Sequence, residues 1–345
     1  MKKYANYIKM NIVVTTIAPP TTGMVALSQG MQPIGGTLFV VGDRKGPFKY
    51  ELPNVDFYSL ERQHRLEYSI TRLLPEGHYV RKNLGYLVAM EAGSEVIVET
   101  DDDNIPLPEF WVKRELIISA EVLQTRGWIN AYSHFTSDLI WPRGLPLQEI
   151  QAASEPVRLK TLGSQMCESP IQQGLANGDP DVDAIYRLTR KLPLSFDEKS
   201  PLFLPPGAWC PFNSQNTTFF PVAYPLLYLP SNCTFRMTDI WRSFIAQRCL
   251  WAMKMGMVFT SATVYQERNE HNLMRDFEHE IPGYQNNARI CSLLEKLSLC
   301  PGRDKESVCS NLIACYRSLV EEKIFPPSES TLVEAWCADV LKVLK

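Results

Sequence analysis

The sequence lacks the features that mark several classes of protein. Its net charge is -3, so no positive field holds nucleic acid or an anionic membrane by charge alone. No stretch is apolar enough to cross a bilayer, and residues 1–10 contain no apolar core of signal-peptide length. We therefore expect no nucleic-acid partner, no integral membrane segment and a cytoplasmic location.

Two nucleotide-binding motifs and the zinc-binding cysteine patterns are also absent. No G-x-G-x-x-G or G-x-x-x-x-G-K-[ST] follows the first expected strand, which leaves a dinucleotide fold and a P-loop unsupported. The nine cysteines include no C-x-x-C pair and fit no zinc spacing. Several of them occupy apolar helical positions, so we interpret them as reduced core residues.

An apolar strand that ends in three consecutive carboxylates is the most informative feature present. Val96–Thr100 reads V-I-V-E-T, which favours a buried strand, and Asp101, Asp102 and Asp103 follow directly. Adjacent carboxylates repel one another unless a cation lies among them. Their hard oxygens suit Mg²⁺ or Mn²⁺, ions that usually also hold a substrate phosphate. The alternative is a solvated acidic turn, but the strand in front of it favours a metal–diphosphate site.

Strands and a helix alternate along the first hundred residues. The expected strands cover residues 11–17, 37–41, 55–58 and 96–100, and the expected helix covers residues 81–93. This order predicts an α/β fold with a parallel or mixed sheet wound like a nucleotide-binding fold. Further along, residues 238–251 read as a helix capped by Thr238, and residues 257–264 read as a strand. From residue 286 onward the apolar spacing is helical, which indicates a small bundle or flank.

Polar side chains at the expected strand ends form a candidate nucleotide pocket. Thr15, Thr16 and Asp43 end the first two strands, and Arg81 and Lys82 open the helix before the acidic strand. For those two cations the alternative is a solvated helix start. The predicted nucleotide-binding residues are Thr15, Thr16, Asp43, Arg81, Lys82, Asn83, Asp101 and Asp102.

The middle of the chain, from about residue 128 to 230, has little periodicity and many Pro, Gly and Asn residues. Three of its segments combine aromatic with short polar side chains, a composition that suits a sugar ring and its hydroxyls. The candidate sugar or acceptor residues there are Trp141, Arg143, Asp179, Asp181, Asp183, Asn213, Gln215 and Asn216. For the three aspartates the alternative is a helix cap followed by an acidic first turn.

Asp239 lies in the first turn of the expected helix over residues 238–251. It could serve only the helix dipole, or it could act as a general base. Trp241 and Arg242 lie beside it and extend the list of acceptor candidates. His271 lies in a segment rich in charged residues, where a lone histidine is more often a surface residue than a ligand.

Six segments in the same order resemble the STELLO family of glycosyltransferase-like proteins. They read Y-V-R-K-N-L-G-Y-L-V-A-M-E-A-G, V-E-T-D-D-D-N, I-W-P-R-G-L-P, G-D-P-D-V-D-A-I-Y-R-L-T-R, P-F-N-S-Q-N-T and D-I-W-R-S-F-I-A-Q-R. A more distant likeness is to the reversibly glycosylated polypeptides, which include UDP-arabinopyranose mutases. The plant members of the STELLO family carry an N-terminal membrane anchor, and we do not expect their compartment to carry over to this chain.

The resemblance implies a GT-A glycosyltransferase fold, a nucleotide-sugar donor and Mn²⁺ or Mg²⁺ bound through a D-x-D element. It assigns Asp103 to the metal with Asp101 nearby, and it suggests His271 as a further ligand of the metal or diphosphate. In such enzymes the base of an inverting transfer often opens a helix with a Q-x-x-R-W-like element. Asp239 is similar in position, although the following Q-R-C-L-W departs from that spacing.

We therefore predict a GT-A-like nucleotide-sugar-binding and acceptor domain over residues 1–284 and a C-terminal helical extension over residues 285–345. The predicted function is metal-dependent, inverting transfer of a sugar, with a UDP-sugar favoured as donor, to a glycan or another hydroxyl acceptor. The alternatives are a nucleotide-sugar mutase, which has no acceptor, and a catalytically idle GT-A scaffold that binds a partner. The sequence leaves the oligomeric state open.

Overall fold

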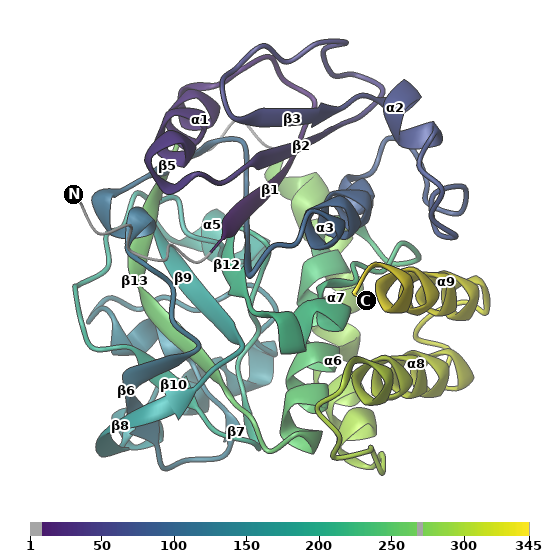
Figure 1. Cartoon of the computed structure of the whole chain (residues 1–345). Helices are drawn as coiled ribbons and strands as arrows, with labels where there is room; N and C mark the ends of the chain where they lie inside the picture. The colour runs from purple at the N-terminus through teal and green to yellow at the C-terminus, as the bar shows by residue number, and fades with distance from the viewer. Residues whose placement is uncertain (1–8, 268–271, 345) are drawn as a thin grey trace.

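This computed structural model describes residues 9–267 and 272–344, and eleven strands among them form one mixed sheet (Figure 1). The strand order is β3-β2-β1-β4-β12-β9-β13-β10-β6-β8, with β5 paired to β13. The strands of this sheet are β1 (Met10–Thr16), β2 (Leu38–Gly42), β3 (Val55–Tyr58), β4 (Val96–Thr100), β5 (Asn104–Pro106), β6 (Ile117–Leu123), β8 (Thr161–Glu168), β9 (Ile171–Gly178), β10 (Leu202–Leu204), β12 (Asn216–Phe219) and β13 (Met257–Gln266). A separate two-stranded sheet joins β7 (Gly127–Trp128) to β11 (Ala208–Trp209).

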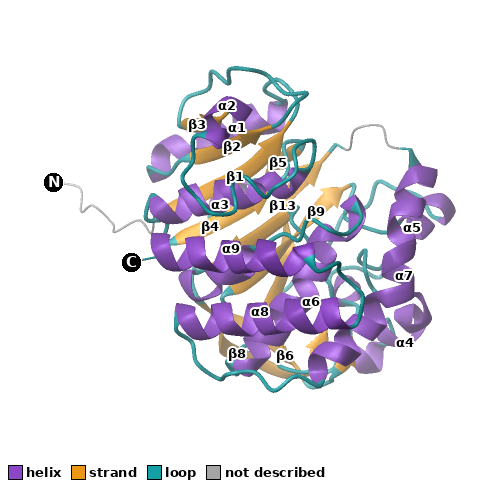
Figure 2. Cartoon of the chain, turned by 90° about the vertical axis from the view of Figure 1, so that its right-hand side faces the viewer, coloured by secondary structure: helices purple, strands orange, loops and turns teal. Residues whose placement is uncertain are grey.

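Helices flank the sheet, and α6, α8 and α9 form a layer in front of the strands in Figure 2. The α-helices are α1 (Thr22–Ile34), α2 (Leu60–His64), α3 (Lys82–Glu91), α4 (Ile150–Ala153), α5 (Ala184–Thr189), α6 (Thr238–Ala252), α7 (Leu273–Glu295), α8 (Lys305–Glu321) and α9 (Ser328–Val343). Within residues 9–267 and 272–344, no helix combines the length and the apolar character needed to traverse a bilayer. The predicted α/β class, a GT-A-like mixed sheet flanked by helices and followed by C-terminal helices, is confirmed.

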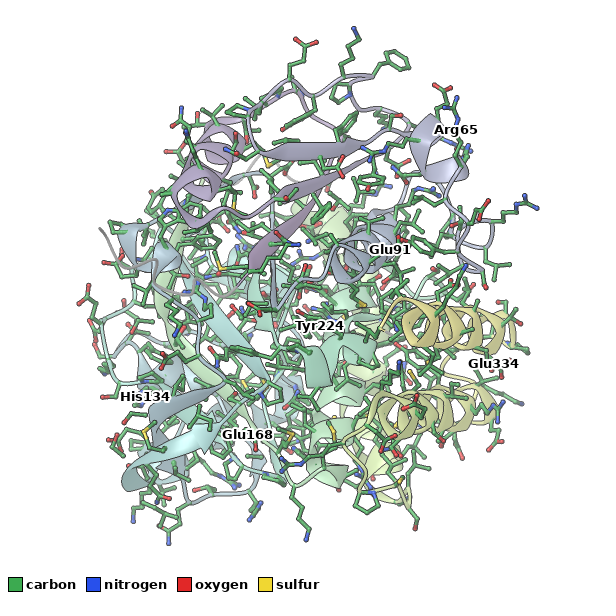
Figure 3. All side chains as sticks on the ribbon, in the orientation of Figure 1. Arg65, Glu91, His134, Glu168, Tyr224 and Glu334 are labelled. Atoms are coloured by element: carbon green, nitrogen blue, oxygen red, sulfur yellow. The ribbon has the colours of Figure 1, made fainter. Side chains whose placement is uncertain are left out.

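The strands β1, β2 and β4 are buried on both faces, and side chains surround them in Figure 3. Val13 of β1 and Ile97 of β4 belong to the core that contains α3 and α6, whereas Val14 and Val98 belong to a second core with α1. Successive side chains of a strand point to opposite faces, so a strand covered on both sides is apolar throughout. This arrangement explains why β4 reads as an uninterrupted apolar run before its acidic end.

The sequence prediction lacks several elements of the structure, among them one helix and two central strands. The sequence predicts that β1 leads directly into β2, but α1 lies between them, with Met24, Leu27 and Met31 buried against the sheet. Gly and Pro residues within α1 obscure this apolar spacing in the sequence. The strands β9 and β12 lie in the middle of the chain, where the sequence shows little periodicity. Their polar residues form hydrogen bonds across the sheet, for example from Gln173 Nε2 to the carbonyl of Asn216 at 3.1 Å.

The C-terminal helices continue the main core. The helix α7 runs through residue 284, so the predicted boundary between residues 284 and 285 lies inside a helix. Trp336 of α9 donates from Nε1 to the carbonyl of Pro225 at 2.8 Å, and Asp339 accepts from the backbone N–H groups of Ser69 and Ile70 at 2.7 and 2.9 Å. These contacts fix α9 to segments that are far away in the sequence.

The boundaries of α6 position Asp239 as the sequence predicts, but the cap differs. The helix begins at Thr238, with Met237 as its N-cap, so the prediction that Thr238 caps the helix is wrong by one residue. A short 3₁₀ helix, η7 (Phe235–Met237), leads directly into α6. The backbone at the N-cap is therefore already helical, and no side chain forms a capping hydrogen bond there. Asp239 still lies in the first turn of α6.

Candidate active site

Strand direction brings the candidate residues to one edge of the sheet. The strands β1, β2 and β4 are parallel, β9 and β13 run in the same direction as these, and β12 runs in the opposite direction. The carboxyl ends of the five strands and the amino end of β12 therefore share an edge. In α/β sheets ligands bind outside the carboxyl ends of the strands.

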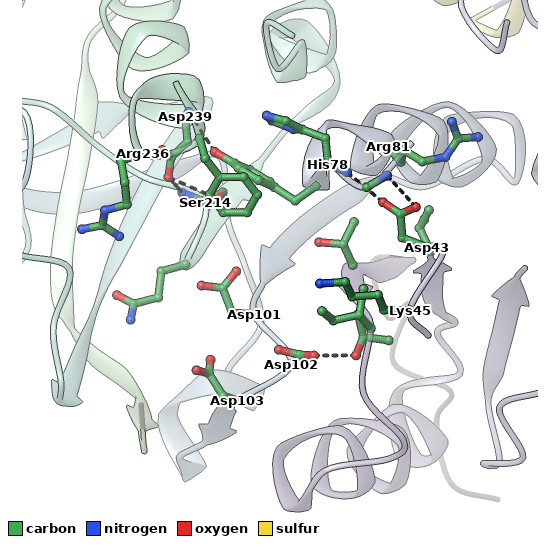
Figure 4. A pocket seen from close by; sticks show the side chains of 18 of the residues that line it. Asp43, Lys45, His78, Arg81, Asp101, Asp102, Asp103, Ser214, Arg236 and Asp239 are labelled. Atoms are coloured by element: carbon green, nitrogen blue, oxygen red, sulfur yellow. Dashed lines mark hydrogen bonds between the residues drawn. The ribbon is translucent and has the colours of Figure 1, made fainter. Parts of the chain in front are cut away.

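A cavity of about 630 Å³ opens at this edge (Figure 4). This volume lies within the range of roughly 300–1,000 Å³ that is typical of sites for small ligands. The predicted site residues that line the cavity are Thr15, Thr16, Asp43, Arg81, Asp101, Asp102, Asp103, Arg143, Asp181, Gln215 and Asp239.

The carboxylates of the acidic triplet lie in the wall of the cavity, each in different surroundings. Asp102 accepts a hydrogen bond from Thr16 Oγ1, and Asp103 Oδ1 accepts one from Gln266 Nε2 at 3.0 Å. Burial raises the pKa of Asp101 to about 8; a nearby lysine opposes this effect, and the charges of Asp103 and Asp102 add to it. Because the three carboxylates repel one another, a cation bound among them would stabilise their charged forms.

The lysine next to Asp101 is Lys82, which lies behind the triplet and not in the cavity wall. Its Nζ lies 3.7 Å from Asp101 Oδ1 and donates to the carbonyl groups of Thr100 and Ser214 at 3.1 and 3.5 Å. The side chain is only 1% exposed. Lys82 therefore holds the end of β4 and the backbone at Ser214 together, and its burial disfavours the direct diphosphate contact that the sequence predicts.

The side chains of two further predicted nucleotide-binding residues, Arg81 and Asn83, form hydrogen bonds with other groups of the protein. The guanidinium of Arg81 donates to Gln63 Oε1 at 2.5 Å and to the carbonyl of Leu74 at 3.3 Å, and it points away from the acidic triplet in Figure 4. The side chain of Asn83 both donates to and accepts from the backbone of Leu229, each at 2.9 Å. Neither side chain is therefore placed to bind a diphosphate.

Asp239 belongs to a buried network of charges at the other end of the cavity. Arg143 donates to both of its oxygens at 3.0 and 2.9 Å, and Arg143 also donates to both oxygens of Asp181 at 2.8 and 2.7 Å. The N–H and hydroxyl of Ser214 donate to Asp239 Oδ2 at 3.0 and 3.3 Å. Burial raises the pKa of Asp239, but the charge and hydrogen bonds of Arg143 outweigh burial and hold the pKa well below its usual range.

Two other aspartates of the middle segment and Trp141 do not line the cavity. Asp183 is the N-cap of α5, where it accepts from Tyr186 N at 2.7 Å and from Trp141 Nε1 at 2.8 Å. Asp179 forms an ion pair with Arg187. The helix-cap alternative therefore describes Asp183, and the indole of Trp141 serves that cap instead of presenting a polar group to a sugar.

The remaining acceptor candidates also point into the protein. Asn213 Oδ1 accepts from the N–H of Gln215 at 3.0 Å, and Asn216 Nδ2 donates to a carbonyl and a threonine hydroxyl at 2.9 and 2.8 Å. Trp241 Nε1 donates to an asparagine of α7 at 2.9 Å. Arg242 forms a bidentate ion pair with a buried glutamate of β4. Their neighbours in sequence reach the cavity, but these four side chains do not line it.

An aromatic wall of the cavity is missing from the sequence prediction. His78, Tyr79 and Phe235 line the cavity, with the ring centroids of His78 and Tyr79 at 5.1 and 4.6 Å from that of Phe235. Burial lowers the pKa of His78 to about 4, and Val80 N donates to its Nδ1 at 3.2 Å. The ring is therefore neutral with its proton assigned to Nε2. The H-Y-V run before the basic helix start was the available signal.

The residues of the cavity fit a cation that is shared with a phosphate-bearing ligand. Within residues 9–267 and 272–344, no three His, Cys, Asp or Glu side chains are grouped to hold a metal by themselves. His271, the further ligand that the resemblance suggests, lies outside the described residues. Asp101 and Asp103 offer hard oxygens, and Mg²⁺ is usually bound by one or two carboxylates together with substrate phosphates and water.

Comparison with known proteins identifies the family. Residues 236–344 match the family described as STELLO glycosyltransferases, a match that includes Asp239 and α6–α9. The chain is 28% identical over 361 residues to a protein of Arabidopsis thaliana named Probable glycosyltransferase STELLO1, an alignment that covers 99% of this chain and 45% of that protein. It is 31% identical over 275 residues to Probable glycosyltransferase STELLO2 of the same plant, covering 74% of this chain and 35% of that protein.

The chain thus spans less than half the length of these two relatives. The matched part extends over nearly the whole of this chain, including the acidic triplet and the strands that surround it. Both relatives and the matching family are named as glycosyltransferases. We conclude that this chain carries a glycosyltransferase-like domain of the STELLO family.

Proposed function

We propose that the cavity binds a nucleotide sugar and transfers the sugar to a hydroxyl acceptor with the help of a divalent cation. The observation that carries this proposal is the position of Asp101 and Asp103 in the wall of the cavity, at the carboxyl edge of a mixed sheet. Membership of a family named for glycosyltransferases supports the choice of reaction.

Asp101 and Asp103 would hold the metal, with His271 kept as a candidate from the resemblance. When bound, Mn²⁺ or Mg²⁺ supplies positive charge that stabilises the diphosphate as it leaves. The protein prepares this position, because Gln266 fixes Asp103 and the ammonium of Lys82 holds Asp101 from behind. Thr16 holds the third carboxylate, that of Asp102, towards the end of β1.

The end of the cavity that contains Asp181 and Asp239, here called the acceptor end, is suited to hydroxyl groups. Asp181 and Asp239 are hydrogen-bond acceptors that Arg143 holds in place, and Gln215 adds an amide to the same wall. Ionised carboxylates accept hydrogen bonds and offer none, so they select ligands that donate. A sugar or glycan presents many such donors.

The predicted role of Asp239 as a general base meets a physical objection. A general base works best when its pKa lies near the operating pH, and the contacts with Arg143 hold the pKa of Asp239 far lower. The contacts favour a second role, in which Asp239 orients Arg143 and the backbone at Ser214. In Asp239→Asn, the side-chain NH₂ group would face one of these hydrogen-bond donors and leave it without an acceptor. We therefore expect the free energy of unfolding to fall by about 1.5–3 kcal/mol in denaturant titration.

Asp181→Asn is the matched control for the role of Asp239, because Asp181 shares the same arginine and lines the same cavity. If both variants lose similar stability and similar activity, Asp239 acts through Arg143. If Asp239→Asn alone loses about 10²–10⁴-fold in rate while it folds and binds donor normally, the orienting role is contradicted and Asp239 is the base.

The reaction itself is tested by incubating the protein with a panel of nucleotide sugars, UDP-sugars first, in the presence of Mn²⁺ and candidate glycan acceptors. Transfer predicts free nucleotide together with a glycosylated acceptor. A donor whose sugar ring has changed, with no free nucleotide, would indicate a mutase. Protein that binds none of the donors would indicate a scaffold and would contradict the proposal.

A further inference from the structure

We infer that Lys45, in the turn after β2, is a binding residue for the diphosphate of the donor. This inference rests on the proposed function, since it names the group that would meet the phosphates opposite the acidic triplet. Lys45 lines the cavity, and Figure 4 shows its side chain extending from the turn into the cavity on the side of Asp101 and Asp102. Neither the sequence motifs nor the comparisons assign it a role.

The turn that carries Lys45 is held firmly at its base. Asp43 Oδ1 accepts from the N–H groups of Arg44 and Gly77 at 2.7 and 2.8 Å, and Oδ2 accepts from His78 N at 2.9 Å. The carboxylate of Asp43 therefore ties the end of β2 to the loop before α3. A nucleotide contact through Asp43, which the sequence predicts, would compete with these backbone donors.

A close approach of backbone presses the same turn onto the end of β1. Gly46 N donates to the carbonyl of Asp43 at 2.7 Å, which closes a tight turn with Lys45 at its third position. A Cβ at Gly46 would lie 3.4 Å from both Thr16 O and Ile17 Cα, and 3.1 Å from Asp43 O. The turn therefore lies within contact distance of the end of β1, and Lys45 emerges beside the strand ends that line the cavity.

Exposure together with the lack of a partner among the described residues distinguishes Lys45 from the other cations of the cavity wall. The cationic side chains that line the cavity are Arg44, Lys45, Arg81, Arg143, Arg187 and Arg236. Four of the arginines form ion pairs with carboxylates, and the guanidinium of Arg81 donates to Gln63 and a backbone carbonyl. As far as residues 9–267 and 272–344 are concerned, Lys45 has no ion pair or side-chain hydrogen bond, and its side chain is exposed.

The cavity thus contains the ammonium of Lys45, which has no counter-ion in the part of the chain that the structure describes, and the three carboxylates of the acidic triplet. A ligand that bridges the ammonium and the carboxylates would suit this arrangement. A diphosphate complexed with a divalent cation meets both requirements, because the carboxylates would hold the cation and the ammonium would pair with phosphate oxygens. Lys45 would thereby compensate negative charge that the metal leaves on the phosphates. The D-R-K-G turn at the end of an apolar strand was the signal in the sequence.

The test is calorimetric binding of UDP, and of GDP, CDP and ADP in parallel, in the presence of Mn²⁺. Lys45→Ala should weaken binding of the preferred diphosphate by about tenfold, the loss of one charged hydrogen bond, and Lys45→Arg should restore most of it. Lys49→Ala is the control, because Lys49 is exposed on the same loop but does not line the cavity. It should change the affinity by less than about twofold.

The outcomes of this experiment separate the role of Lys45 from the proposed function. Wild-type affinity in Lys45→Ala, with binding by the wild-type protein intact, overturns the role of Lys45 and leaves the proposed function standing. A loss that Lys45→Arg does not restore overturns the assignment to charge. Absence of binding of all four diphosphates to the wild-type protein contradicts both the role of Lys45 and the proposed function. Thermal melting of each variant shows whether the fold is kept, as the exposure of Lys45 leads us to expect.

Discussion

Asp103→Asn should abolish turnover of the nucleotide sugar while the protein stays folded. The substitution removes a charged oxygen ligand from the cavity wall, and the amide has a similar shape. Loss of a charge from a triplet of mutually repelling carboxylates should not lower the stability of the metal-free protein. The measurement is nucleotide release with excess Mn²⁺, together with a thermal melt of the same preparation.

The neighbouring substitution Asp102→Asn separates metal ligation from general loss of negative charge. Asp102 accepts from the hydroxyl of Thr16, and an asparagine oxygen can accept the same hydrogen bond. We expect Asp102→Asn to keep measurable turnover, whereas Asp103→Asn and wild-type protein in EDTA show none. Full activity of the wild-type protein in EDTA, or of Asp103→Asn, would contradict the metal assignment. Equal losses of turnover in Asp102→Asn and Asp103→Asn would show that the effect comes from lost negative charge and not from a lost metal ligand.

Arg242→Met should destabilise the protein by about 3–5 kcal/mol, because it leaves a buried carboxylate without its cation. Arg242 donates to Glu99 Oε2 and Oε1 at 2.9 and 2.6 Å, and Glu99 is fully buried. Burial lowers the pKa of Arg242, but the charge of Glu99 outweighs burial and keeps the pKa above its usual value. Denaturant titration measures the effect.

A double variant shows whether the ion pair is the cause of that loss. Replacing Glu99 by Gln together with Arg242→Met removes both charges, so the double variant should be more stable than Arg242→Met alone. The sequence prediction placed Arg242 at the acceptor. A variant Arg242→Met that unfolds like the wild type but binds acceptor poorly would favour that prediction over the structural role.

The sequence reveals the part of the site that is built from local signals. The apolar run of β4, the acidic triplet after it and the helix α3 before it are contiguous in the chain, and each has the expected position in the structure. The class of fold follows from this alternation. The strands β9 and β12 were not predicted, because their polar side chains are satisfied by partners across the sheet that only the folded chain supplies.

At the acceptor end of the cavity, the sequence does not predict in which direction each side chain points. Asp239 and Arg242 lie less than one turn apart on α6, yet Asp239 lines the cavity and Arg242 points towards β4. A sequence pattern locates the helix but not the partner that each charged residue finds. Lys45 was missed for the complementary reason, since its position depends on the close contact between Gly46 and the end of β1. The cytoplasmic location, the metal and the donor base stay predictions.

A crystal structure of the protein soaked with UDP and Mn²⁺, with data collected at a wavelength where manganese scatters anomalously, tests whether the acidic triplet binds the metal of a nucleotide complex. We expect an anomalous peak between Asp101 and Asp103, with the diphosphate in the cavity between that peak and Lys45. Nucleotide bound outside the cavity, or nucleotide in the cavity with no manganese at the acidic triplet, would contradict this expectation.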